Sequence, residues 1–153
     1  PELLIADEPV SMLDVSIRAD ILKLLSALQK NKGISFIFIT HDLSTAASFA
    51  NRIAVMYLGR IVELGTTNEV LQHPQHPYTK ALLSVSPVAN PRLRKKKQIL
   101  EGDPPNPINI PRGCRFAPRC PVVTAKCKEI DPQLESVSAS HEVACILVNS
   151  NGQ

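Results

Sequence analysis

The sequence predicts an α/β fold in the first part of the chain, followed by a small loop-rich extension that holds the cysteines. Two short apolar runs, at residues 3–6 and 34–40, are typical of strands buried on both faces. Between them, apolar residues recur at helical spacing. Of the 13 prolines, 11 lie between Pro74 and Pro132, and all four cysteines follow Gly113, so regular structure is expected mainly before these residues.

The first run ends in Asp7-Glu8-Pro9, because proline does not continue a strand. The helix is predicted from the spacing of its apolar residues, and Gly33 is placed to end it. These apolar residues are Ile17, Ile21, Leu24, Leu25 and Leu28. The second strand ends at His41-Asp42. A strand, a helix and a strand in this order predict a right-handed parallel crossover.

Further elements follow as far as residue 85. A short helix is expected over residues 43–51, and two strands, 52–58 and 60–64, should meet at Gly59. The sequence Thr66-Thr67-Asn68-Glu69 matches a capping box that opens a helix to about Gln72. Pro77 suits the first turn of another helix, which should reach about Val85.

Proline and charge then divide the chain into three predicted parts: an α/β part at residues 1–86, a proline-rich basic linker at 87–112, and a cysteine-containing extension at 113–153. The basic run at residues 92–97 is interpreted as solvated rather than as a nucleic-acid site, because no recognition module accompanies it. Attraction to an anionic membrane surface is a smaller possibility. The extension has few periodic segments, so a covalent cross-link or a bound metal should be needed to stabilise its fold.

The composition is that of a globular chain of about one domain: 153 residues, 44% hydrophobic and 20% charged. A 4% aromatic content argues against a stacking platform for single-stranded nucleic acid, and a net charge of +3 demands no polyanionic partner. No apolar run approaches the roughly 18 residues of a membrane span, so a soluble chain is expected. The chain opens without a methionine and is expected to begin within a longer protein.

Two candidate functional residues follow the two predicted parallel strands. Glu8 comes directly after the first strand and His41 after the second. Ligands of open parallel sheets bind beyond the carboxyl ends of the strands, so one crossover should bring these two side chains to a common site.

These residues closely resemble the second half of an ABC-transporter ATP-binding subunit. Residues 3–8 are similar to its Walker B strand, residues 11–14 to its D-loop, and His41 to its switch histidine. Such a site would transfer a phosphoryl group mainly by positioning and charge stabilisation. Asp7 would hold Mg²⁺ through water, and Glu8 would orient or deprotonate the attacking water. The resemblance further implies that His41 contacts the terminal phosphate of ATP and that Asp14 acts across a head-to-tail dimer of two ATPase subunits.

Two motifs of that family are absent from the sequence. Neither a phosphate-binding loop of the form G-x-x-x-x-G-K-[ST] nor a Leu-Ser-Gly-Gly-Gln type signature occurs. Both precede the Walker B strand in the family. The chain is therefore expected to be a C-terminal fragment that alone neither binds ATP well nor hydrolyses it.

Three later segments narrow the resemblance to the ATPase subunits of dipeptide and oligopeptide importers, although nickel importers share much of the pattern. These are residues 56–65, 73–83 and 102–121. The family implies transmembrane permease subunits, indirectly an extracytoplasmic peptide-binding protein, and a place on the cytoplasmic face of the cell membrane. A DNA-repair type of ABC ATPase and a module that only binds metal are the alternatives.

The cysteines Cys114, Cys120, Cys127 and Cys145 have the spacing C-x5-C-x6-C-x17-C. Two disulfides are disfavoured where ATP is used, because thiols there stay reduced. Zn²⁺ is possible, but the usual C-x2-C pairs are missing. The irregular spacing favours an iron–sulfur cluster, and the family resemblance implies [4Fe–4S] in some members. His141 is an alternative ligand, more readily a surface residue or one that supports the ligands, while His73 and His76 are expected to pack at the start of a helix.

Overall fold

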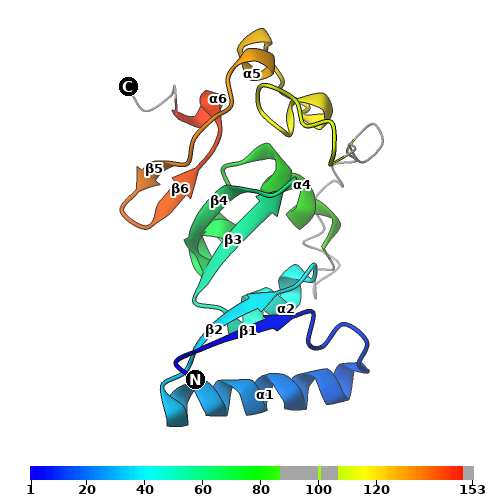
Figure 1. Cartoon of the computed structure of the whole chain (residues 1–153), viewed down its shortest axis with the longest axis vertical. Helices are drawn as coiled ribbons and strands as arrows, with labels where there is room; N and C mark the ends of the chain where they lie inside the picture. Colours follow the sequence, from blue (N-terminus) through cyan, green and yellow to red (C-terminus); the bar gives the residue numbers. More distant parts are fainter. Residues whose placement is uncertain (87–99, 101–106, 150–153) are drawn as a thin grey trace. The chain divides into compact units, whose positions relative to one another are not determined.

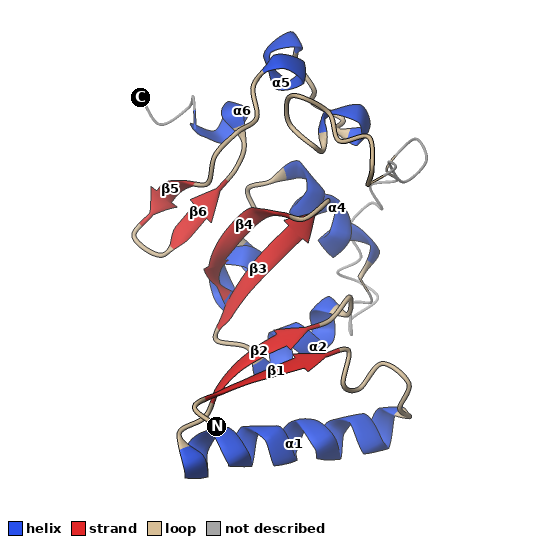
Figure 2. Cartoon of the chain, in the orientation of Figure 1, coloured by secondary structure: helices blue, strands red, loops and turns tan. Residues whose placement is uncertain are grey.

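The computed structural model describes residues 1–86, 100 and 107–149 (Figures 1 and 2). The chain divides into two compact units, Pro1–Ala50 and Asn51–Gln153. Each unit is described by itself.

The first unit contains β1 (Leu3–Asp7), α1 (Val15–Lys32), β2 (Ser35–Ile39) and α2 (Leu43–Phe49). Strands β1 and β2 pair in parallel, with Ile5 opposite Ile37. Helix α1 ends as predicted, because Gly33 takes the left-handed conformation (φ 65°) that favours glycine and donates its N–H to the carbonyl of Gln29. On one face of the sheet, Phe36 and Phe38 pack against Phe49 of α2, with ring centroids 5.8 and 5.1 Å away.

The other face of this two-stranded sheet is apolar and open. Leu3 and Ile5 of β1 and Ile37 and Ile39 of β2 are 47–63% exposed. Because side chains alternate along a strand, these four share one face. A continuous apolar sheet face of this kind is a surface for a further layer of protein.

The second unit is built around an antiparallel sheet with the strand order β3-β4-β6-β5 (Figure 2). Its elements are β3 (Arg52–Tyr57), β4 (Arg60–Thr66), α3 (Thr67–Gln72), α4 (Pro77–Val85), a 3-10 turn η2 (Ala117–Arg119), α5 (Ala125–Glu129), β5 (Glu135–Ser138), β6 (His141–Val143) and α6 (Ile146–Asn149). Two strands therefore come from the extension, and β6 pairs directly with β4. Strands β3 and β4 meet in a tight turn in which Leu58 and Gly59 both have positive φ, 46° and 74°.

The capping box at the start of α3 is confirmed. The Thr66 hydroxyl accepts from the Glu69 N–H (3.3 Å), and a Glu69 oxygen accepts from the Thr66 N–H (3.2 Å). The same carboxylate accepts hydrogen bonds from the hydroxyls of Ser138 (2.9 Å) and Ser140 (2.8 Å). Glu69 thus both caps α3 and ties the β5–β6 hairpin to it.

The mixed α/β class is confirmed, and the finer prediction of parallel strands needs a correction. Among the strands of the described residues, only β1 and β2 pair in parallel, and the four-stranded sheet is antiparallel. The physical reason is the short turn at Gly59, since a two-residue connection can only join antiparallel neighbours.

The predicted boundaries at residues 86 and 113 do not coincide with the division of the structure, which falls after Ala50. Pairing of β6 with β4 makes the extension part of the second unit. Most of the predicted linker, with its basic run, lies outside the described residues. In the described part of the chain, no helix combines the length and the apolar character that crossing a membrane requires.

The first prediction concerns the carboxyl of Glu69. Hydrogen bonds from Thr66, Ser140 and Ser138 lower the pKa of Glu69 to about 2. Because the folded pKa lies below its ordinary value, the stabilisation is present above pH 4.5 and should be lost as the pH falls towards 2. Ser140→Ala should raise the titration midpoint of Glu69, as measured by NMR of its side-chain carboxyl carbon.

Ser136→Ala, on the same hairpin, is the control and should leave that midpoint unchanged. A Glu69 midpoint near 4.5 in the unaltered chain, or one that Ser140→Ala does not move, would contradict this description of the α3 cap.

Candidate functional site

The first candidate site lies at the carboxyl ends of β1 and β2, where Glu8 and His41 meet. A Glu8 carboxylate oxygen lies 2.7 Å from Nδ1 of His41 and also accepts the His41 backbone N–H at 3.0 Å. The Glu8 N–H in turn donates to the carbonyl of Ile39 (2.9 Å). Glu8 has a positive φ of 46°, a conformation that is costly outside glycine and often found at functional sites. The structure therefore brings together the two residues that the sequence placed at one site.

Asp7 and Asp14 are both exposed. Asp7 is the last residue of β1 and pairs with Ile39 in the sheet. Asp14 precedes α1 as its N-cap, but its carboxylate makes no capping hydrogen bond. Within the described part of the chain, neither carboxylate has a hydrogen-bonding partner, so both are free to bind a ligand.

Sequence reasoning missed a connection between the 11–14 loop and the segment that holds His41. Arg18 of α1 donates to the carboxylate of Asp42 (3.1 Å) and to the carbonyl of Leu13 (3.5 Å). Asp42 also caps α2, accepting from Ser44 N–H (2.9 Å) and the Thr45 hydroxyl (2.7 Å). An arginine in the first turn of a helix and an aspartate just before the next helix were the available signals.

The charge of Asp42 is favoured by these contacts. Burial raises the pKa of Asp42, but the hydrogen bonds from Thr45 and Ser44 and the positive charge of Arg18 outweigh it. The net result is a pKa below the ordinary value of 3.8. Asp42 therefore stays ionised and keeps Arg18 beside the strand end that carries His41.

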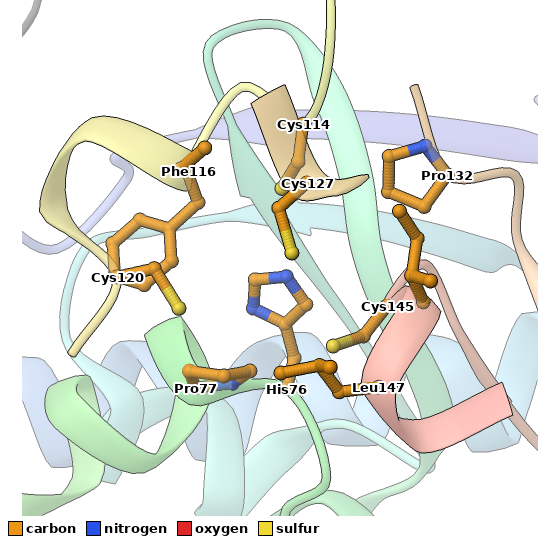
Figure 3. Close-up of a pocket in the computed structure, with 11 residues that line it drawn as sticks. His76, Pro77, Cys114, Phe116, Cys120, Cys127, Pro132, Cys145 and Leu147 are labelled. Carbon is orange, nitrogen blue, oxygen red and sulfur yellow. The ribbon is translucent and has the colours of Figure 1, made fainter. Parts of the chain in front are cut away.

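The second candidate site is a small cavity in the second unit, and all four cysteines line it (Figure 3). Its volume is about 10 Å³, roughly enough for one water molecule. The remaining wall consists of His76, Pro77, Phe116, Ala117, Pro132, Ile146 and Leu147. Cys127 and Cys145 are buried, and Cys114 and Cys120 are half-buried. The four residues that the sequence grouped by spacing thus share one apolar cavity.

A close backbone approach brings the first and third cysteines together. The Cys114 N–H donates to the carbonyl of Cys127 at 2.8 Å. A Cβ on the preceding Gly113 would lie 2.5 Å from that same carbonyl oxygen. Only glycine fits at this position, so Gly113 allows the Cys114 loop to lie against α5.

The surroundings of Cys114 and Cys120 have opposing effects on the pKa of each thiol. Burial raises the pKa of Cys114, and the backbone N–H groups of Phe116 and Ala117 oppose this shift. Burial also raises the pKa of Cys120, which the backbone of Val122 opposes. Charges on Cys127 and Cys145 would raise both values further, as expected for clustered thiols. The loops therefore supply donors to sulfur, while the cavity disfavours bare thiolates.

All four cysteines are free thiols, and no disulfide joins any two of them. No group of three or more His, Cys, Asp or Glu side chains in the described ranges is arranged to hold a metal ion. A tetrahedral zinc with Zn–S bonds of about 2.3 Å would need the four sulfurs within about 4 Å of one another. The arrangement is thus not that of a ready zinc site.

A buried carboxylate, that of Glu63, accepts a hydrogen bond from the backbone of His76, one of the residues that line this cavity. Glu63 of β4 is 0% exposed and accepts three hydrogen bonds. Two come from the N–H groups of Gln75 (2.7 Å) and His76 (3.0 Å). The third partner is Nε2 of His141, 2.7 Å away on β6.

The histidines of the second unit can now be assigned. His141 is 3% exposed and bonded to Glu63, so the interpretation of it as a surface residue is wrong. His76 begins α4 as predicted, and its Nδ1 accepts the Tyr78 N–H at 3.1 Å. Burial, with the charge of Lys80, lowers the pKa of His76 to about 4, so the ring is neutral at neutral pH.

Comparison with known proteins shows that the chain is similar to transport ATP-binding proteins. The chain is 49% identical over 149 residues to the dipeptide transport ATP-binding protein DppF of Haemophilus influenzae. It is 50% identical over 151 residues to the oligopeptide transport ATP-binding proteins OppF of Salmonella typhimurium and Escherichia coli. Each alignment covers 97% of this chain and 45–46% of the relative. The chain thus spans about half the length of these curated relatives.

A second match is to a family model. Residues 62–127 match the family described as oligopeptide/dipeptide transporter, C-terminal region. The resemblance predicted from the sequence is therefore confirmed: the chain is similar to peptide transport ATP-binding proteins over 97% of its length, and its residues 62–127 match a C-terminal region of that family.

Proposed function

We propose that the complete protein hydrolyses ATP to drive a membrane importer of dipeptides or oligopeptides. The observation that carries this proposal is the contact between Glu8 and His41 at the ends of two parallel strands. Relatives that align with 97% of the chain are named as peptide transport ATP-binding proteins, which supports peptides as the cargo. Glu8 and His41 would be the catalytic residues.

The proposed chemistry assigns a separate task to each side chain. Glu8 would orient the attacking water and accept its proton. Its hydrogen bond to His41 fixes the imidazole, which would contact the terminal phosphate of ATP. Asp7, exposed and unpartnered within the described residues, fits a Mg²⁺ ion bound through water, because a hard cation prefers carboxylate and water oxygens. Bound Mg²⁺ would supply charge neutralisation at the phosphates.

Other parts of the ATPase would complete the site. Asp14 would act across a head-to-tail dimer with a second ATPase subunit, and Arg18 would link its loop to the His41 segment. The open apolar face of β1 and β2 would be covered by the remaining part of the ATP-binding domain. Permease subunits at the cytoplasmic face of the membrane, and through them an extracytoplasmic peptide-binding protein, would be the partners.

We also propose that Cys114, Cys120, Cys127 and Cys145 hold a [4Fe–4S] cluster. Four free thiols on one apolar cavity match the number and kind of ligands that such a cluster takes. Backbone N–H groups aimed at Cys114 and Cys120 would stabilise thiolates once the metal is bound. The sequence spacing of the cysteines, which lacks the usual C-x2-C pairs, favours a cluster over a single Zn²⁺ ion. When bound, the cluster would cross-link the loop of Cys114 and Cys120, helix α5 and the residue before α6.

The second prediction tests the ATPase site in the complete protein. Glu8→Gln should lower ATP turnover at least about a hundredfold while ATP binding is kept, because an amide has the shape of the carboxylate but not its basicity. Asp7→Asn should instead weaken Mg²⁺-dependent nucleotide binding, and His41→Ala should slow hydrolysis with affinity largely kept. Phosphate release and nucleotide titration measure these effects.

Glu2→Gln, at the opposite end of the same strand, is the control and should behave like the unaltered protein. Near-normal turnover in Glu8→Gln would remove Glu8 from the role of base. The isolated chain should hydrolyse no ATP and bind it weakly. Tight binding of MgATP to this chain would contradict the proposal that other parts of the ATPase complete the site.

The third prediction tests the cysteines. Anaerobically purified protein should be brown and contain iron and sulfide, because four thiolates gathered by the fold hold a cluster. Cys120→Ser or Cys127→Ser should remove the colour and make the extension sensitive to protease, since ligation and folding are coupled. Val122→Ser, an exposed neighbour, should keep both.

A colourless preparation with stoichiometric zinc would establish zinc in place of the cluster. A preparation with neither metal, in which all four thiols of the folded protein react with an alkylating reagent, would end the metal proposal.

A further inference from the structure

The imidazole of His41 is mostly exposed, so surrounding side chains do little to hold it in place. Its side chain is 79% exposed, and that of Glu8, which it meets, is 34% exposed. A contact between two such exposed groups contributes little stability by itself. The geometry of the pair therefore depends on how firmly the backbone segments that carry Glu8 and His41 are held.

The segment that carries Glu8 is tied to the loop that follows it. The carbonyl of Glu8 accepts hydrogen bonds from the N–H (3.3 Å) and the hydroxyl (3.0 Å) of Ser11. Further along this loop, the carbonyl of Leu13 accepts a long hydrogen bond from Nη2 of Arg18 (3.5 Å). The backbone N–H of Arg18 also donates to the carbonyl of Asp14 (2.8 Å). The loop is thus anchored to Arg18 at its end.

The segment that carries His41 is anchored through the next residue, Asp42. The Asp42 N–H donates to the hydroxyl of Thr40 (3.1 Å), and its carboxylate caps α2. The same carboxylate accepts from Nη1 of Arg18 at 3.1 Å. Arg18 therefore contacts both segments, one with each terminal nitrogen of its guanidinium.

These contacts form a closed ring around the candidate site. From Glu8 the ring follows the loop to the Leu13 carbonyl and Arg18. The guanidinium then reaches Asp42, and the neighbouring His41 returns to Glu8. Nε of Arg18 is buried without a partner among the described residues, and an unpaired buried donor costs stability. Stability of the fold is therefore not a sufficient reason for an arginine at this position.

We propose that Arg18 is a positioning residue for ATP hydrolysis, which holds His41 against Glu8 by joining the two segments that carry them. This inference rests on the ATPase function proposed above. Arg18 itself would touch neither ATP nor the attacking water. Its effect on the rate would be large, because a displacement of about 1 Å at a reacting site can cost about a hundredfold in rate.

Two substitutions break the bridge in different ways. Arg18→Gln replaces the guanidinium with a shorter, uncharged amide. Asp42→Asn keeps an oxygen that can cap α2, since asparagine caps about as well as aspartate, but it loses the charge that pairs with Arg18. Lys23→Gln is the matched control, because it removes a different ion pair of α1, the exposed contact of Lys23 with Asp20 (3.3 Å).

In the complete protein, Arg18→Gln and Asp42→Asn should each lower kcat for ATP at least about tenfold, with KM for ATP changed less than about twofold. The double variant should be no slower than the slower single variant, because both changes break the same contact. In this chain, the His41 amide donates to the Glu8 carboxylate at 3.0 Å and should exchange with solvent faster in both variants. Lys23→Gln should change neither kcat nor this exchange.

Several results would overturn the inference: an unchanged kcat, a raised KM alone, additive losses in the double variant, or unchanged exchange of the His41 amide. A lower melting temperature with a normal kcat would do the same, because Arg18 would then have a purely structural role.

The unaltered complete protein separates this inference from the proposed function. If it hydrolyses no ATP, the ATPase proposal fails and the positioning role fails with it, while the exchange of the His41 amide still shows whether Arg18 holds that segment. If it hydrolyses ATP and Glu8→Gln loses turnover, the ATPase proposal stands, and the variants of Arg18 and Asp42 decide the role of Arg18 alone.

Discussion

The buried carboxylate of Glu63 is the constraint on which the second unit depends. A carboxylate removed from water is costly unless it is hydrogen-bonded, and Glu63 accepts from Gln75, His76 and His141. These partners lie on the loop before α4 and on β6, so one side chain of β4 holds two other segments. His76 then places its ring in the cysteine cavity, and β6 leads directly to Cys145. Removing Glu63 would leave the N–H groups of Gln75 and His76 without this acceptor.

The two candidate sites are each built from one unit. Glu8, His41, Arg18 and Asp42 belong to the first unit, and the cysteines, His76 and Glu63 belong to the second. In the first unit, the charge of Asp42 keeps Arg18 in contact with both loops. In the second, a mainly apolar cavity gathers the thiols. Loss of the proposed cluster should therefore affect the stability of the second unit more than the contact between Glu8 and His41.

The features predicted correctly from the sequence are those determined by nearby residues. Gly33 ends α1, Thr66 and Glu69 cap α3, and Pro77 begins α4, because each signal lies within one helical turn of the structure it controls. The meeting of Glu8 and His41 follows from the rule for parallel strand ends. The contact between Glu63 and His141 joins residues 78 apart in sequence, and nothing local to either residue indicates it. The pairing of β6 with β4 also joins residues far apart in sequence, so it could not be predicted either.

Hydrogen exchange at the amides of Gln75 and His76 tests the central role of Glu63 most directly. Both N–H groups donate to its carboxylate, so they should exchange slowly in the unaltered chain. Glu63→Gln should speed their exchange at least about fivefold, because losing a buried acceptor costs about 1–3 kcal/mol. Glu135→Gln on exposed β5 should not change it. Fast exchange of both amides in the unaltered chain, or protection that survives Glu63→Gln, would contradict the account.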